Sequence, residues 1–394
     1  MKQYLNVSVF YILLWSLYYL QGTLYAEGSI ISQLLLLLLL LYSSYCFVKV
    51  VVSYKLPPLF VSINIFLGIM TIYGIIFIIL PQNIYMGDDL STPVVKMNFL
   101  KNLYMSILPI YVMFYFSKKK ILTEKVVKFI FIILLITYMF LFERNYQSEL
   151  LDLLEKNSNE ERVVNNMAYH FLKLFPLLFF WNKKPLVQFL FTAVIFSFIL
   201  SGMKRGVILI GFICLLWFLY NILKNSHAKQ RLVVVLLSAL FIIVGILYVS
   251  NLYESDLFFK YRIEQTLEGD SSSRDIIYST LWEHFQQESS LLKMLFGNGV
   301  FYTVFISGTF AHNDWLELLT NQGLLGVFAY LLFYITFAYT IYLNRRNLFF
   351  VSVMGMSLII MFISSFISMS YDAIGLAPAL GIGYSMCQIS NKRI

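Results

Sequence analysis

Apolar segments of roughly 17 to 25 residues recur along the chain, and this pattern limits the possible folds more than any other feature. A segment of this length crosses about 30 Å of hydrocarbon as a helix. Lipid offers no partners to backbone N–H and C=O groups, so a spanning segment must bond internally, as a helix does. Hydrophobic residues make up 59% of the 394 residues and charged residues 13%, which excludes a soluble globule. We therefore expect an all-α integral membrane protein.

The segments predict about twelve transmembrane helices within a single polytopic domain, residues 1–394. A cleaved signal peptide is an alternative for the first segment, although another apolar span follows almost at once. The segments lie near residues 4–21, around the leucine run Leu34–Leu41, and near 57–80, 99–116, 128–143, 166–182, 185–201, 206–223, 232–250, 315–343, 348–369 and 371–390.

Charge in the connecting loops predicts the orientation. Lys and Arg gather in the even-numbered connections, and most acidic residues lie in the odd-numbered ones. Because positively charged loops stay on the cytoplasmic side, we expect both termini in the cytoplasm. The net charge of +8 then reflects membrane orientation rather than nucleic-acid binding. The three cysteines fall inside apolar segments, so neither a disulfide framework nor a thiolate metal site is expected.

The longest loop, residues 251–311, lies on the outer side between predicted helices 9 and 10. A loop of about sixty residues is more often functional than decorative. Within it, Ile277, Leu281 and Phe285 repeat on one face after a capping-box pair, Ser272 with Asp275. This pattern predicts an amphipathic helix that lies on the outer membrane surface or over a cavity.

Arg274 falls in the first turn of this predicted helix. A cation is unfavourable there unless an anion binds nearby, and a solvated arginine is the alternative interpretation. The GNG sequence at Gly297–Gly299 then predicts a turn that leads the chain back towards His312.

His312 stands at the outer start of a long apolar segment. Asn313 and Asp314, which follow it, are favoured helix N-caps. The positive end of a helix dipole disfavours an imidazolium ion, so His312 would tend to stay neutral and able to accept a proton near pH 7. The alternative is a histidine that merely sits at the membrane interface.

Four further cationic or titratable residues are candidates for binding an anion. SGMKRG, residues 201–206, predicts a tight outward turn that holds Lys204 and Arg205. Both could anchor the turn at the interface, or they could bind phosphate, which an arginine fork matches bidentately. In the sixth span, His170 and Lys173 share a helix face. Ionisable residues inside a span are functional candidates, although either could extend to the interface.

The sequence gives little reason to expect a metal or cofactor. Asp88 and Asp89 could bind a divalent ion, but an acidic, solvated loop is the simpler interpretation. The chain contains no HExxH, paired CxxC, Walker loop or GxSxG motif, so it offers no support for a zinc protease, an NTPase or a serine hydrolase.

Together these features resemble the O-antigen ligase and polymerase family of bacterial envelope enzymes. HNDWLELLTNQGLLG is similar to the family signature HN-x-x-L-x-x-x-x-x-x-G-x-x-G. His312, Asn313, Leu316, Gly323 and Gly326 stand at its fixed positions.

Two cationic motifs extend the resemblance, which covers about residues 185–345. SSRDIIYSTLW, followed by GNG, is similar to a helix in the family's long loop and places its arginine at Arg274. SGMKRG is similar to the family's S-x-S-R-G turn and places its arginine at Arg205. Lys204 stands where a serine is common, so only the role of the arginine carries over.

The resemblance implies an inverting, metal-independent glycosyltransferase on the outer face of the bacterial plasma membrane. Its donor would be an undecaprenyl-diphosphate-linked oligosaccharide, whose leaving group needs fixed cations and no protonation. The acceptor hydroxyl needs a base to take its proton. The resemblance assigns this role to His312, and the ordinary pKa of a histidine side chain lies near the working pH. The candidate diphosphate contacts are Arg205, Arg274, Lys204, His170 and Lys173.

Among the possible functions we favour a polymerase of O-antigen or capsular polysaccharide, because the Lys-Arg doublet of the turn resembles polymerase members. A ligase that transfers the glycan to lipid A core is the alternative within the family. A lipid-linked oligosaccharide flippase or another transporter is the alternative from a different class, although span centres lack the carboxylates that proton-coupled carriers keep. The expected partners are the lipid-linked donor, membrane lipid, a flippase and a chain-length regulator.

Overall fold

The structure, a computed structural model, describes residues 6–79, 93–155, 164–225, 228–255, 257–267, 274–368, 370–371 and 374–390. Within these ranges every regular element is a helix and no strand occurs. The prediction of an all-α protein is confirmed. The predictions made for Asp88, Asp89 and Ser272 concern residues outside the described ranges.

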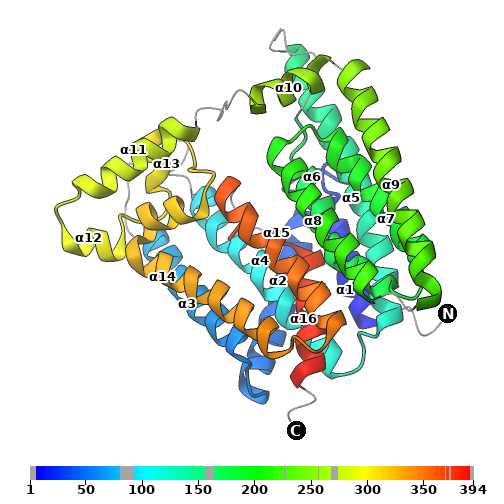
Figure 1. The fold of residues 1–394 in the computed structure, drawn as a ribbon. Coiled ribbons are helices and arrows are strands. Elements are labelled where there is room, and N and C mark those ends of the chain that lie inside the picture. Colours follow the sequence, from blue (N-terminus) through cyan, green and yellow to red (C-terminus); the bar gives the residue numbers. More distant parts are fainter. Residues whose placement is uncertain are drawn as a thin grey trace.

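The order of the helices follows the order of the apolar segments (Figure 1). The first part of the chain forms α1 (Val7–Tyr19), α2 (Ile30–Ser53), α3 (Pro58–Ile79), α4 (Pro93–Lys118), α5 (Glu124–Glu155), α6 (Ala168–Leu172), the 3-10 helix η1 (Phe175–Trp181), α7 (Pro185–Ser201) and α8 (Arg205–Asn225). The second part forms α9 (Ala228–Ser255), α10 (Leu257–Leu267), α11 (Arg274–Gln287), α12 (Leu291–Phe296), α13 (Tyr302–Ser307), α14 (Asp314–Leu343), α15 (Leu348–Ile367) and α16 (Leu376–Ser390).

Eight of the described helices are long and apolar enough to cross a membrane, as in a multi-pass membrane protein. They are α2, α3, α4, α5, α8, α9, α14 and α15. Three shorter apolar stretches, α1, α6 with η1, and α7, accompany them. The predicted sixth span is not one continuous α-helix, because Pro176 lies at the start of η1 and a proline has no N–H to donate within a helix.

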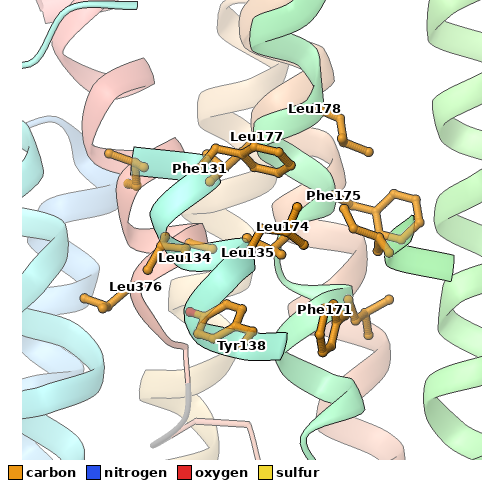
Figure 2. Close-up of a cluster of buried hydrophobic side chains, with 14 of the residues drawn as sticks. Phe131, Leu134, Leu135, Tyr138, Phe171, Leu174, Phe175, Leu177, Leu178 and Leu376 are labelled. Atoms are coloured by element: carbon orange, nitrogen blue, oxygen red, sulfur yellow. The ribbon is translucent and has the colours of Figure 1, made fainter. Parts of the chain in front are cut away.

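Aromatic and aliphatic side chains from helices far apart in the sequence form the core. Figure 2 shows part of it, where Tyr138 of α5 lies near Phe171 of α6, with 6.4 Å between the ring centroids. The ring of Phe171 stacks on Phe198 of α7 at 4.3 Å between centroids and 5° between planes. These contacts hold α6 and η1 against α5 and α7, and thereby fix the end of α7 from which the 201–206 turn emerges.

The predicted loop 251–311 is largely helical. Helix α9 extends to Ser255 and is followed by α10, whereas α11, α12 and α13 gather beside the first part of α14 (Figure 1). The predicted amphipathic helix is confirmed as α11, which begins at Arg274. Its Leu281 is buried while Ile276 and Trp282 are exposed, so one face packs on the protein as the spacing indicated. The loop thus brings Arg274 to the start of α14.

Candidate active site

His312 occupies a short link between α13 and α14 in a left-handed backbone conformation, with φ of 52°. A non-glycine residue adopts this conformation only where the surrounding contacts hold it. The next residue, Asn313, is the N-cap of α14: its side-chain oxygen accepts the backbone N–H groups of Trp315 at 3.0 Å and Leu316 at 3.2 Å. The predicted capped helix start is therefore confirmed for Asn313.

Asp314 has a different role from the cap that the sequence suggested. Its carboxylate is fully buried and accepts the Ser370 backbone N–H at 2.8 Å, the Ser370 hydroxyl at 2.5 Å and the Tyr330 hydroxyl at 2.6 Å. Because Ser370 lies three residues beyond Ile367, the last residue of α15, these bonds join the start of α14 to the chain that leaves α15.

Glu317, one turn further along α14, holds the chain on the other side of His312. Its buried carboxylate accepts the backbone N–H of Ala311 at 2.9 Å, the hydroxyl of Thr303 at 2.5 Å and the side-chain amide of Asn321 at 2.8 Å. Hydrogen bonds to a carboxylate are stronger than those between neutral groups. The chain is therefore fixed on both sides of His312. The Glu317 carboxylate holds Ala311 before it, and the Asp314 carboxylate, held by Ser370 and Tyr330, fixes the chain after it.

Gly323 interrupts α14, and the predicted GNG turn packs against this interruption. Its φ of 66° and ψ of −161° lie outside the helical region. The backbone N–H groups of Asn298 and Gly299 donate to Thr320 at 3.2 Å and Asn321 at 2.8 Å, the carbonyls that the interruption exposes. A side chain at Gly323 would come within 2.7 Å of the Leu295 backbone, so only glycine fits. The α12–GNG segment thus docks onto the break in α14.

The end of α15 is the point where the site residues meet. The last carbonyls of a helix have no partner within it. The Ile367 carbonyl accepts an N–H of the Arg274 guanidinium at 3.0 Å. The Phe366 carbonyl accepts the Tyr278 hydroxyl at 3.3 Å and the Asn313 amide at 3.4 Å. The negative end of the α15 dipole thus compensates the cation that is unfavourable at the start of α11.

Tyr278 also ties α11 directly to the histidine, because its hydroxyl lies 3.4 Å from the His312 carbonyl oxygen. The imidazole itself is in the electrostatic field of two cations. Partial burial lowers the pKa of His312 from its ordinary 6.5, and the positive charges of Arg274 and Lys204 lower it further. The residue as a whole remains exposed, so its ring can reach solvent or a bound molecule. A neutral, proton-accepting imidazole is the result.

The predicted outward turn places Lys204 and Arg205 at the same end of α15. Met203 in the turn has a left-handed φ of 51°, and Arg205 is the first residue of α8. The Gly206 backbone lies against Ile367, since a Cβ on Gly206 would come within 3.0 Å of the Ile367 side chain. Ile367 therefore contacts both the turn and, through its carbonyl, Arg274.

His170 and Lys173 occupy a different environment. The His170 ring packs on Tyr138 at 4.9 Å and lies 6.4 Å from Tyr19, between α5 and α1. Lys173 lies close enough to act on it electrostatically. This aromatic setting is the core of the bundle, so the structure does not bring His170 together with His312 as it does Arg274 and Lys204.

The part of the chain that the structure describes contains no group of three or more His, Cys, Asp or Glu residues able to hold a metal ion.

Sequence reasoning missed the supporting residues Glu317, Tyr278 and Ser370. A signal existed for one of them: Asp314 and Glu317 are carboxylates on the same face at the start of an otherwise apolar segment, and buried acids require partners. No local signal marks Tyr278 or Ser370, because their partners are distant in the sequence. The partners of Tyr278 lie 34 and 88 residues away, and the partner of Ser370 lies 56 residues away.

Comparison with protein-family models gives no match for this chain. Comparison with curated proteins likewise gives no significant match.

Proposed function

We propose that the protein is a metal-independent glycosyltransferase of the bacterial envelope, and that it polymerises lipid-linked glycan repeat units on the outer face of the plasma membrane. The observation that carries the proposal is the convergence of His312, Arg274 and Lys204 at the end of α15. A neutral imidazole beside fixed cations is the set of groups needed to deprotonate a hydroxyl and to hold an anionic leaving group.

In this reaction the acceptor hydroxyl oxygen attacks the anomeric carbon of the donor. The new C–O bond forms as the bond from that carbon to the diphosphate oxygen breaks, and the diphosphate leaves with the bonding electron pair. His312 takes the hydroxyl proton, and Arg274 with Arg205 and Lys204 stabilises the negative charge of the diphosphate. Because one displacement occurs, the configuration at the anomeric carbon inverts. Positioning and electrostatic stabilisation account for most of the rate.

An apolar cavity that extends to the end of α7, where the 201–206 turn begins, supports a polyprenyl donor. It has a volume of about 560 Å³ and lies between α7, α8 and α9, with Leu200 and Val249 among its lining residues. Leu216 and Ile246, also in the lining, are 67% and 63% exposed, so the cavity opens towards lipid. Leu200 directly precedes the turn that holds Lys204, so a bound prenyl chain would have its diphosphate beside the cations.

The proposed topology has about twelve spans, with α1, α6 with η1, α7 and α16 crossing in addition to the eight long helices. Both termini then lie in the cytoplasm, and the start of α14 faces outward. This arrangement follows the positive-inside rule and places the site where lipid-linked repeat units would be joined.

The test is a His312→Ala substitution in the native host, with surface glycans and lipid-linked intermediates separated on gels. We expect single repeat units to reach the surface while the polymer ladder disappears. Full-length polymer that accumulates on undecaprenyl diphosphate would indicate a ligase, and an unchanged ladder would contradict the role of His312. Glu283→Gln, on the exposed side of α11, is the matched control and should leave the ladder intact.

A further inference from the structure

A second cavity, of about 750 Å³, lies at the opposite end of the bundle from the candidate active site. The link between α2 and α3 forms its rim, with Tyr54, Lys55 and Pro57. The last residue of α4, Lys118, and the C-terminal parts of α14 and α16 complete it. Helix α14 begins at the candidate active site and reaches this cavity only in its second half, at Leu332 and Thr336.

The rim of this cavity is positively charged. Lys55 and Lys118 both belong to the lining, and the lining contains no acidic residue. The Lys118 ammonium lies 5.7 Å from the Tyr54 ring centroid and 5.6 Å from that of Phe114, which holds it at the cavity. Helix α3 starts at Pro58 in the same lining, so the positive end of its dipole adds to the field of the lysines.

The wall of the cavity is apolar and faces lipid. Val61 and Ile65 of α3 line it and are 45% and 43% exposed, and Leu332 of α14 and Ile389 of α16 continue the apolar surface. A cationic rim above an apolar wall matches an amphiphile with a negative head and a hydrocarbon tail. A free phosphate ion would use the rim and leave the wall empty.

We propose that this cavity binds an anionic phospholipid, with its phosphate between Lys55 and Lys118 and an acyl chain along Val61 and Ile65. The leaflet is the one at the α4 C-terminal end, which the charge of the loops places on the cytoplasmic side. The site does not depend on the proposed glycosyltransferase activity, because it shares no residue with the candidate active site. Each lysine should contribute about 5-fold to lipid affinity.

The test measures lipid binding to the purified full chain by native mass spectrometry. The two lipids compared are phosphatidylglycerol and phosphatidylcholine with identical acyl chains. We expect phosphatidylglycerol to bind more tightly, and the Lys55→Gln, Lys118→Gln double variant to lose about 25-fold in its affinity. Lys119→Gln is the matched control, because Lys119 is adjacent and exposed but lies outside the lining. Its affinity should equal that of the wild type.

Ile65→Trp tests the apolar wall with both lysines intact, and it should also weaken phosphatidylglycerol binding because the indole fills the cavity. Melting curves of all the variants should match the wild type, which separates loss of binding from loss of folding. Equal affinity for the two lipids, or unchanged binding in the double lysine variant, would overturn the proposal. Competition by millimolar inorganic phosphate as effective as that by phosphatidylglycerol would also overturn it, since the site would then bind a free anion.

Discussion

Replacement of Glu317 by glutamine should release the segment that carries His312. Glutamine has the shape of glutamate but only one acceptor oxygen. The carboxylate accepts Ala311 N–H on one oxygen, and the Asn321 amide with the Thr303 hydroxyl on the other. Either orientation of the glutamine amide therefore turns its NH₂ group towards a donor. Asn321 cannot rotate to relieve this, because its own oxygen accepts the Thr303 N–H at 3.0 Å.

A buried donor left without an acceptor costs about 1 to 3 kcal/mol, and a lost bond to a charged group costs somewhat more. The free energy that keeps residues 303–311 docked on α14 should fall by this amount. Where exchange proceeds by local opening, backbone amides in that segment should then exchange about 5- to 150-fold faster. The distant core between α5 and α7 should keep its protection, because none of its contacts involves Glu317.

The assay is hydrogen exchange followed by mass spectrometry on the purified protein, with peptides that cover residues 303–311 and a reference peptide from α5. Glu283→Gln is the matched control, because it makes the same chemical change on the exposed face of α11. Exchange in the Glu317→Gln variant that equals the wild type would refute the reasoning. Faster exchange throughout the chain would also refute it, since the effect would then be global unfolding rather than release of one segment.

Three further predictions concern the site itself. Arg274→Lys should lower glycan polymerisation at least about 10-fold, because an ammonium cannot replace a bidentate guanidinium; a rate equal to the wild type at matched protein levels would contradict this. The acid limb of the pH–rate profile should lie below pH 6.5, because burial and then Arg274 and Lys204 lower the pKa of His312. Lys204→Gln removes one of these charges, so the acid limb of the variant's pH–rate profile, normalised to its own maximum, should move to higher pH. An acid limb that stays in place or moves to lower pH would argue against His312 as the base. Gly323→Ala should destabilise the docked GNG turn by more than about 1 kcal/mol, measured by melting temperature or protease sensitivity, because of the left-handed φ and the close Leu295 backbone. Gly245→Ala in α9, where the added Cβ would meet no other part of the protein within 4 Å, should be neutral or slightly stabilising, and equal effects of the two substitutions would contradict the docking.

Features that depend on neighbouring residues were predictable from the chain. Most of the apolar segments correspond to single observed helices, and the spacing of Ile277, Leu281 and Phe285 predicted α11 with Arg274 in its first turn. The N-cap at Asn313 was predictable because a cap bonds to residues two and three positions ahead. The break in the sixth span at Pro176 carried a local signal that the hydropathy pattern outweighed.

Hydropathy was enough to establish a helical membrane protein, because it is a property of short stretches of chain. His312 was singled out by its place before Asn313 and Asp314 at the start of an apolar segment and by the motif around it, which are also local features. The tertiary structure alone decided what holds that histidine. Its supports are the buried carboxylates of Asp314 and Glu317 and the carbonyl end of α15, and Arg274 reaches that end across 93 residues of sequence. Unsatisfied carbonyls and buried acids take whichever donors the fold brings near them, and helix packing, rather than local spacing, determines which donors those are.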